Sequence, residues 1–120
     1  RFQGLRPIAE VQRKGDKMEA VFGISGGQIS SDMTRDGRRV ELVFLGQIFD
    51  EKGKAVSDKL PISRYFSMSL SDDQYQGLTS QDLTGHQELD LPPGTYNLTL
   101  VAEDRVAGTL GAQSVEFTVY

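Results

Sequence analysis

One stretch of this 120-residue chain decides its fold: Leu89-Asp90-Leu91-Pro92-Pro93-Gly94-Thr95-Tyr96-Asn97-Leu98-Thr99-Leu100-Val101-Ala102-Glu103-Asp104. A short strand runs into a Pro-Pro-Gly turn, and a longer strand follows in which apolar and polar residues alternate. Period-two alternation places every second side chain on one face of a half-buried strand. The first apolar residue of the longer strand is a tyrosine, Tyr96. This succession is typical of the reversal between the last strands of a β-sandwich.

Three residues of this stretch are assigned structural roles. Tyr96 matches the tyrosine-corner position, where the ring packs inward and the hydroxyl bonds nearby backbone. Gly94 serves the turn before the strand, and Asp104 ends the strand. The Asp104 side chain is expected to bond the backbone ahead of it, opening the loop to Gly108 and Gly111. Tyr96 has no visible partner for acid or base chemistry, so none of the three is predicted to be catalytic.

Outward from this stretch, period-two patterns recur and helical periodicity is nearly absent. The expected strands cover residues 7–13, 18–24, 40–49, 56–62, 66–70, 87–91, 96–102 and 114–119. The nearly continuous apolar run 40–49 predicts a central strand covered on both faces. Because Pro61 interrupts 56–62, that piece is an edge strand at best. Residues 25–38 and 71–80 are polar loops, and the second has room for one helical turn.

Seven or eight strands with turn signals between them predict an all-β fold, a two-layer antiparallel β-sandwich of immunoglobulin or fibronectin type III-like architecture. Residues 1–120 form one domain of ordinary size. Residues 1–6 are expected to be its loosest part, an N-terminal segment of a larger protein. The predicted core comprises Phe22, Leu42, Phe44, Phe66, Met68, Leu98, Leu100, Val115 and Phe117.

Composition narrows the function classes. A net charge of -4 argues against nucleic acid as the main partner. The absence of cysteine excludes disulfides and thiolate metal sites. No apolar run approaches the ~20 residues of a membrane-spanning helix, so no direct membrane insertion is predicted. Residues 1–60 hold 11 basic and 9 acidic side chains, and residues 61–120 hold 2 and 8. This asymmetry fits either solvated strand faces or an acidic edge that meets a neighbouring domain.

The sequence offers no catalytic constellation. His86 is the only histidine and is interpreted as a surface strand residue. A Gly-x-Ser-x-Gly nucleophile elbow is missing. A hydrolase would need a carboxylate pair, such as Asp73 with Asp82 or Glu88, held about 5–9 Å apart in a cleft. We therefore predict no enzymatic activity.

Charged clusters in the loops are weak candidates for ligand sites. The acidic pairs Asp50-Glu51, Asp72-Asp73 and Glu103-Asp104 could converge on calcium, but none has the spacing of a calcium-binding helix-loop-helix. No metal or cofactor is predicted. The single basic cluster is either a polar loop or an anion contact, and it consists of Arg35, Arg38 and Arg39.

The closing segments resemble a known family. These are Pro92 to Leu100, then Ala102-Glu103-Asp104, then Gly108 to Gly111, then Ser114 to Val119, with the turn Phe49 to Lys54 before them. They resemble the end of bacterial (acidobacterial) von Willebrand factor A-related proteins, in which an exported integrin-like A domain is followed by a β-sandwich. The resemblance covers roughly Val40 to Tyr120. It implies a periplasmic, extracellular or cell-surface location. It carries over no active site, because the A domain's Asp-x-Ser-x-Ser metal motif is absent.

The leading prediction is a non-enzymatic accessory or protein-interaction module of an exported bacterial protein. Its partner is a neighbouring domain of the parent protein or another protein, bound through the loops 25–38 and 71–80. The alternative is a carbohydrate-binding β-sandwich, for which only Tyr65, Tyr75 and Tyr120 are candidate platform residues. A homodimer through an edge strand is also open, because the last strand ends at Tyr120 with no Pro or Lys guarding it.

Overall fold

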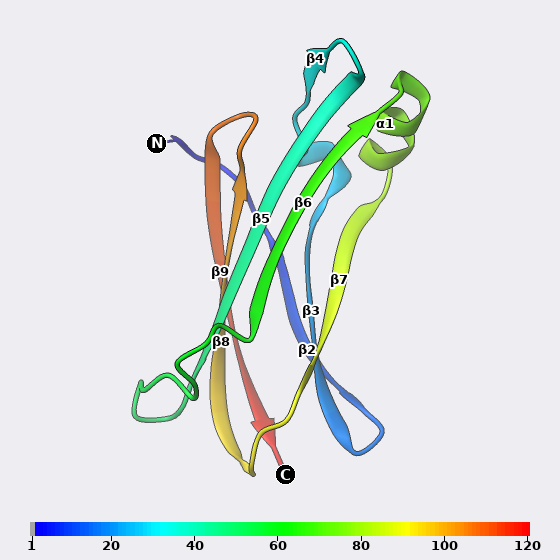
Figure 1. The fold of residues 1–120 in the computed structure, drawn as a ribbon. Helices are drawn as coiled ribbons and strands as arrows, with labels where there is room; N and C mark the ends of the chain where they lie inside the picture. The colour runs from blue at the N-terminus through cyan, green and yellow to red at the C-terminus, as the bar shows by residue number, and fades with distance from the viewer. Residues whose placement is uncertain (1) are drawn as a thin grey trace.

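The computed structural model describes residues 2–120, with side chains described from Gly4 onward. The chain is an all-β, mostly antiparallel structure of two sheets, as the sequence predicts (Figure 1). Its elements are β1 (Phe2–Gln3), β2 (Ile8–Lys14), β3 (Lys17–Ser25), the 3-10 turn η1 (Gly26–Gln28), β4 (Asp32–Thr34), β5 (Gly37–Phe49), β6 (Ile62–Leu70), α1 (Asp72–Thr79), β7 (Asp82–Leu89), β8 (Gly94–Asp104) and β9 (Thr109–Val119). The described chain therefore holds nine strands, where seven or eight are predicted, because β1 and β4 are too short to show a period-two pattern.

The nine strands divide unequally between the sheets. The large sheet has the order β1-β9-β8-β5-β4, with β6 also paired to β5. The small sheet has the order β2-β3-β7. All pairs are antiparallel except β1 with β9. The two sheets form the two layers seen in Figure 1, and the chain crosses between them several times.

The core lies between the sheets and follows the predicted alternation. The rings of Phe22 on β3 and Phe44 on β5 are 5.7 Å apart and join the two layers. Fully buried positions alternate along β3, β5 and β8, as in Ala20, Phe22 and Ile24, in Leu42 and Phe44, and in Leu98, Leu100 and Ala102. Six of the nine predicted core residues are buried: Phe22, Leu42, Phe44, Leu98, Leu100 and Phe117.

The other three predicted core residues are only half-buried. Phe66, Met68 and Val115 pack against the core without being enclosed by it. Phe66 and Met68 belong to β6, which has a strand partner on one side only, and Val115 belongs to β9, near the opposite side of the same sheet. Side chains near a sheet edge have fewer neighbours to cover them, so the prediction of full burial is wrong at these positions.

Three predictions about local structure need correction. β5 is central, but only one of its faces is buried, and Leu45 on the other face is 38% exposed. Residues 71–80 hold an eight-residue helix, because Ser71 and Gln74 form a reciprocal capping box that starts it. Residues 56–61 form no strand, and only Ala55 makes a bridge, to Phe49.

Candidate interaction sites

Tyr96 sits at the beginning of β8 as a corner residue. The residue is 7% exposed, and its ring stacks on that of Phe117, with ring centroids 5.6 Å apart. Its hydroxyl donates to the Pro92 carbonyl at 2.7 Å. Gly94 opens β8, and a Cβ there would lie 3.4 Å from the Tyr96 hydroxyl oxygen, which is an ordinary contact distance. The hydroxyl is thus engaged in holding the turn between β7 and β8.

Asp104 ends β8 as a completely buried carboxylate. Its Oδ1 accepts the backbone N–H groups of Val106 and Ala107 at 3.0 and 3.2 Å. Its Oδ2 accepts the N–H of Ser30 at 2.9 Å, from a loop 74 residues earlier. The carboxylate therefore shapes the β8–β9 turn and also fastens the loop that follows η1 to it. Only the two bonds to Oδ1 are local enough to be predicted from the sequence.

The two loops singled out for binding meet at one end of the sandwich. Arg38 Nε donates to Asp72 at 2.8 Å, and the Arg38 guanidinium lies 5.3 Å above the Tyr75 ring. The Tyr75 hydroxyl donates to the Ile29 carbonyl at 2.6 Å. α1 is thereby fixed against η1 and the start of β5 (Figure 1). Arg38 and Tyr75 are thus occupied within the protein, whereas the β4–β5 hairpin, with Met33 and Arg35, is exposed at this end.

The three tyrosines proposed as a sugar platform do not come together. Tyr75 belongs to α1, Tyr65 lies on the outer face of the large sheet, and Tyr120 follows β9 at the opposite end (Figure 1). Tyr65 donates its hydroxyl to Glu41 at 2.7 Å. No shared aromatic surface for carbohydrate results.

The three carboxylates considered for a catalytic pair are all exposed. Asp73 lies on α1, Asp82 begins β7 and Glu88 lies near its end. Among the described residues, no group of three or more His, Cys, Asp or Glu side chains is placed to hold a metal ion. In the same part of the chain, no helix is long and apolar enough to cross a membrane.

His86 lies on the outer face of the small sheet, as predicted, but it has a partner that the sequence does not reveal. Its Nδ1 lies 2.9 Å from Oε1 of Glu19, whose side chain is only 8% exposed. Gln12 Nε2 and Lys14 Nζ also donate to Glu19, at 3.0 and 3.2 Å. These bonds, that of His86 foremost, lower the pKa of Glu19 to about 2 from 4.5. This cross-strand cluster depends on the register of β2, β3 and β7.

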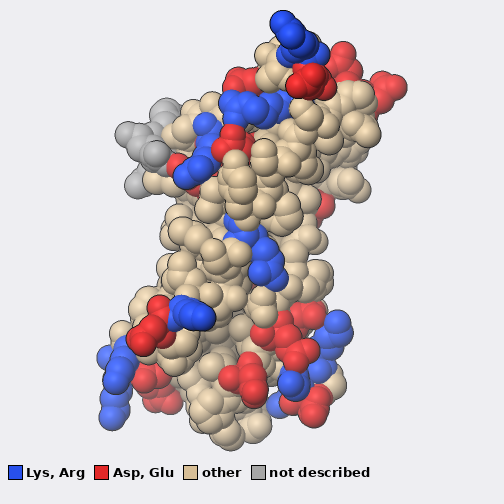
Figure 2. Space-filling model, viewed as in Figure 1, with Lys and Arg blue, Asp and Glu red and all other residues tan. Residues whose placement is uncertain are grey.

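The outer face of the large sheet carries an apolar band. Its members are Val43 and Leu45 on β5, Tyr65 on β6, Val101 on β8, and Leu110 and Ala112 on β9. Leu45 and Val101 are cross-strand neighbours and are each 38% exposed. In Figure 2 the middle of this face has few charged side chains, whereas both of its ends are charged. The sequence carries a signal for this band: Leu45 and Val101 are apolar at positions where the strand alternation expects a polar residue.

Charged side chains close the band at one end. Glu103 and Arg105 form an ion pair at 3.2 Å, and the Arg105 guanidinium lies 5.9 Å above the Tyr65 ring. Glu41 bonds Arg39, which also bonds Asp32 at 2.6 Å. Every one of these charges is matched within the protein, so this border is fixed in place by its own ion pairs.

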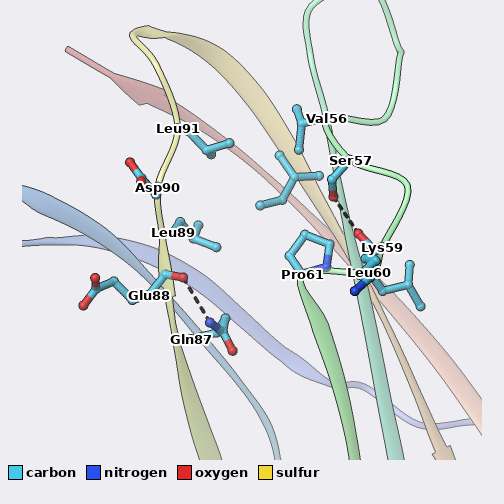
Figure 3. A pocket seen from close by; sticks show the side chains of 11 residues that line it. Val56, Ser57, Lys59, Leu60, Pro61, Gln87, Glu88, Leu89, Asp90 and Leu91 are labelled. Atoms are coloured by element: carbon cyan, nitrogen blue, oxygen red, sulfur yellow. Dashed lines mark hydrogen bonds between the residues drawn. The ribbon is translucent and has the colours of Figure 1, made fainter.

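A hollow of about 270 Å³ opens between the sheets, where β7 ends and β6 begins (Figure 3). Its apolar lining consists of Ile48, Val56, Leu60, Pro61, Leu89 and Leu91, and its polar lining of Ser57, Lys59, Gln87, Glu88 and Asp90. The apolar side chains come from the end of β5, the β5–β6 connection, the end of β7 and the turn that follows it. The hollow thus reaches the core from an open side of the sandwich.

No family model matches the chain, and no curated protein matches it. Among solved structures, it is similar to a hypothetical protein from Pyrococcus horikoshii OT3, with 12% identity and a TM-score of 0.45. That match covers 99% of this chain and 89% of the other.

Proposed function

We propose that this chain is a non-enzymatic accessory module that binds protein. The observation that carries the proposal is the apolar band on the outer face of the large sheet. Contiguous apolar surface with a polar border marks protein interaction sites in soluble proteins. Strand residues such as Leu45 and Val101 could be polar at no cost to the core, because they point away from it. Their apolar character therefore favours a partner that covers them.

We further propose that the sandwich is of fibronectin type III-like or immunoglobulin-like architecture. Its long strands in chain order are β2, β3, β5, β6, β7, β8 and β9. The first, second and fifth form the small sheet, and the others form the large sheet in the order β9-β8-β5-β6. This is the pairing of strands A, B and E against C, F and G that defines those sandwiches. A tyrosine at the start of the sixth long strand, bonded to the preceding backbone, supports the same proposal.

The protein that contains this module is proposed to be an exported bacterial protein of the von Willebrand factor A-related kind. The support is the resemblance of the closing strands and turns. The module would then act in the periplasm, outside the cell or at its surface. Its partner would be the neighbouring domain or a second protein.

A homodimer through the last strand is a separate proposal for the same module. β1 covers β9 only at Thr109 and Leu110, so the rest of β9 has no strand on that side within the described chain. Unpaired strand edges can pair with a second copy. Light scattering at high concentration should then show a dimer, and a monomer at every concentration would refute this pairing.

Site-specific photo-crosslinking in the whole parent protein tests the interaction role. A photoreactive phenylalanine analogue replaces Ala112 in the apolar band or, as the matched control, Glu10 on the outer face of the small sheet. Both positions are exposed strand residues. We expect Ala112 to give a discrete intra- or intermolecular crosslink that Glu10 does not give. Equal labelling at both positions, or none at Ala112, would contradict the proposal.

A further inference from the structure

The β7 edge of the small sheet has one property of peptide-binding sheets. β7 is the last strand of its sheet, and no strand within the described residues pairs with its other side. In an antiparallel ladder, alternate residues turn both their N–H and their C=O away from the paired neighbour. Such a row of unpaired groups is a template on which an extended peptide can add as a further strand.

The hollow at the end of β7 supplies the second property, a place for a side chain. Ile48 and Leu89 lie at its base and are 1% and 5% exposed, so it reaches the core. Leu60, which also lines it, is 43% exposed. Figure 3 shows Leu89 and Leu91 on one side of the gap and Val56 and Pro61 on the other. The volume is just below that of typical small-molecule pockets, and it has room for a bulky apolar side chain.

Arg64 places a positive charge next to the hollow. Its Nη2 donates to Gln87 Oε1 at 2.9 Å, and its guanidinium lies 5.7 Å above the Phe22 ring. Gln87 also lines the hollow, which joins the two features. Within the part of the chain that the structure describes, no carboxylate forms an ion pair with Arg64. A guanidinium held in one orientation is matched to a planar carboxylate.

We propose that β7 binds an extended peptide segment of a partner protein that carries a bulky apolar residue and an aspartate or glutamate two positions away from it. The apolar side chain enters the hollow, and the carboxylate pairs with Arg64. The spacing follows because side chains two positions apart point to the same side of an extended chain. This inference rests on the proposed role in protein binding. It uses residues outside the apolar band, so either site can fail without the other.

The test uses two fluorescein-labelled nonapeptides and the purified chain. One has the sequence Thr-Val-Thr-Glu-Thr-Leu-Thr-Val-Thr, and the other exchanges its Glu and Leu, because a strand can add in either direction. Fluorescence anisotropy should show at least one of them binding with a Kd of about 1 mM or tighter. Replacing the peptide's Glu by Gln, or its Leu by Ala, should weaken binding at least fivefold.

Protein variants locate the peptide. Arg64→Gln should weaken binding about tenfold, because a charge-assisted hydrogen bond is lost. Leu60→Ser should weaken binding several-fold, and Arg35→Gln, on the exposed hairpin at the other end, should have no effect. Circular dichroism checks that each variant is folded. Backbone amide NMR shifts should concentrate on β7 and not on β2, the opposite edge of the same sheet.

Three results would overturn the inference. The first is no binding of either peptide at concentrations up to about 5 mM. The second is equal affinity for the Glu and Gln peptides. The third is a set of NMR shifts centred on β2 or on the apolar band, which would place the peptide elsewhere while leaving the proposed interaction role intact.

Discussion

The outer faces of the two sheets obey the same alternation rule and yet differ in chemistry. On the small sheet, long polar side chains from β2 and β7 close over the middle strand, and Glu19 is left with 8% of its side chain exposed. On the large sheet, Leu45 and Val101 are flanked by the short residues Ser63 and Ala112 and remain 38% exposed. The polar groups on the outer face of the small sheet bond one another, whereas the outer face of the large sheet exposes apolar side chains. An uncovered surface of this kind is the better candidate for a partner.

The largest expected effect separates the inner from the outer side of the large sheet. Leu98→Ala should lower the free energy of unfolding by about 2–5 kcal/mol, because Leu98 is completely buried and truncation leaves a cavity. Leu45→Ala should cost less than about 1 kcal/mol, because its side chain is already partly in water. Urea denaturation measures both, and equal losses would show that the inward phase of β5 and β8 is misassigned.

A smaller effect separates two hydrogen-bonded tyrosines. Tyr96→Phe removes the bond to the Pro92 carbonyl and should cost about 0.5–1.5 kcal/mol. Tyr65→Phe removes the bond to Glu41 from a side chain that is 57% exposed, so water replaces it at almost no cost. Thermal and urea unfolding of both variants give the comparison. The corner role of Tyr96 is contradicted by a neutral Tyr96→Phe variant.

The Glu19 cluster gives the outer face of the small sheet a pH signature. Its pKa is about 2 in the folded protein, below the ordinary 4.5. Its ionised form therefore stabilises the fold above about pH 4.5, and that contribution disappears as the pH falls from 4.5 toward 2. Glu19→Gln should be less stable than the parent at pH 7 and equal to it near pH 2.

Glu10→Gln is the control for that pH series, because Glu10 is an exposed carboxyl on the same outer face of the small sheet. At pH 7 we expect Glu19→Gln to lose more stability than this variant, because Glu19 accepts hydrogen bonds from Gln12 and Lys14 and lies next to His86. If Glu19→Gln loses no more stability than Glu10→Gln, the cluster does not stabilise the fold.

The smallest expected effect on stability concerns the apolar band. The double change Leu45→Ser and Val101→Ser should alter the unfolding free energy by less than about 1 kcal/mol, because both side chains point away from the core. The same change should abolish the crosslink from Ala112. Loss of stability without loss of the crosslink would mean that the band serves folding and not binding.

Strand phasing was predictable because it is a local property. The alternation around Phe22 and Leu98 predicts which face of each strand points inward, whichever strand pairs with it. Full burial was not predictable in the same way: Phe66 and Met68 alternate just as well but lie on a strand paired on one side only. Whether a strand is central or at an edge depends on the whole sheet.

The candidate sites were harder to predict than the fold. Arg64 and Gln87 are 23 residues apart, and Glu19 and His86 are 67 apart. Each pair meets only through strand register or through the packing of two sheets. The apolar residues Leu45 and Val101 are visible in the sequence, but the nearly continuous apolarity of 40–49 predicts burial on both faces. The structure shows that the second face is open.

The sequence by itself determined the all-β class, the inward phase of the long strands and the turn before Tyr96, because a period of two residues and a Pro-Pro-Gly turn act over a few neighbouring positions. Only the tertiary structure decided which strands lie at an edge, that Asp104 reaches Ser30, that Glu19 is closed over by its neighbours, and that a hollow lies beside Arg64. Those features depend on contacts between residues far apart in the chain, which local sequence patterns do not predict.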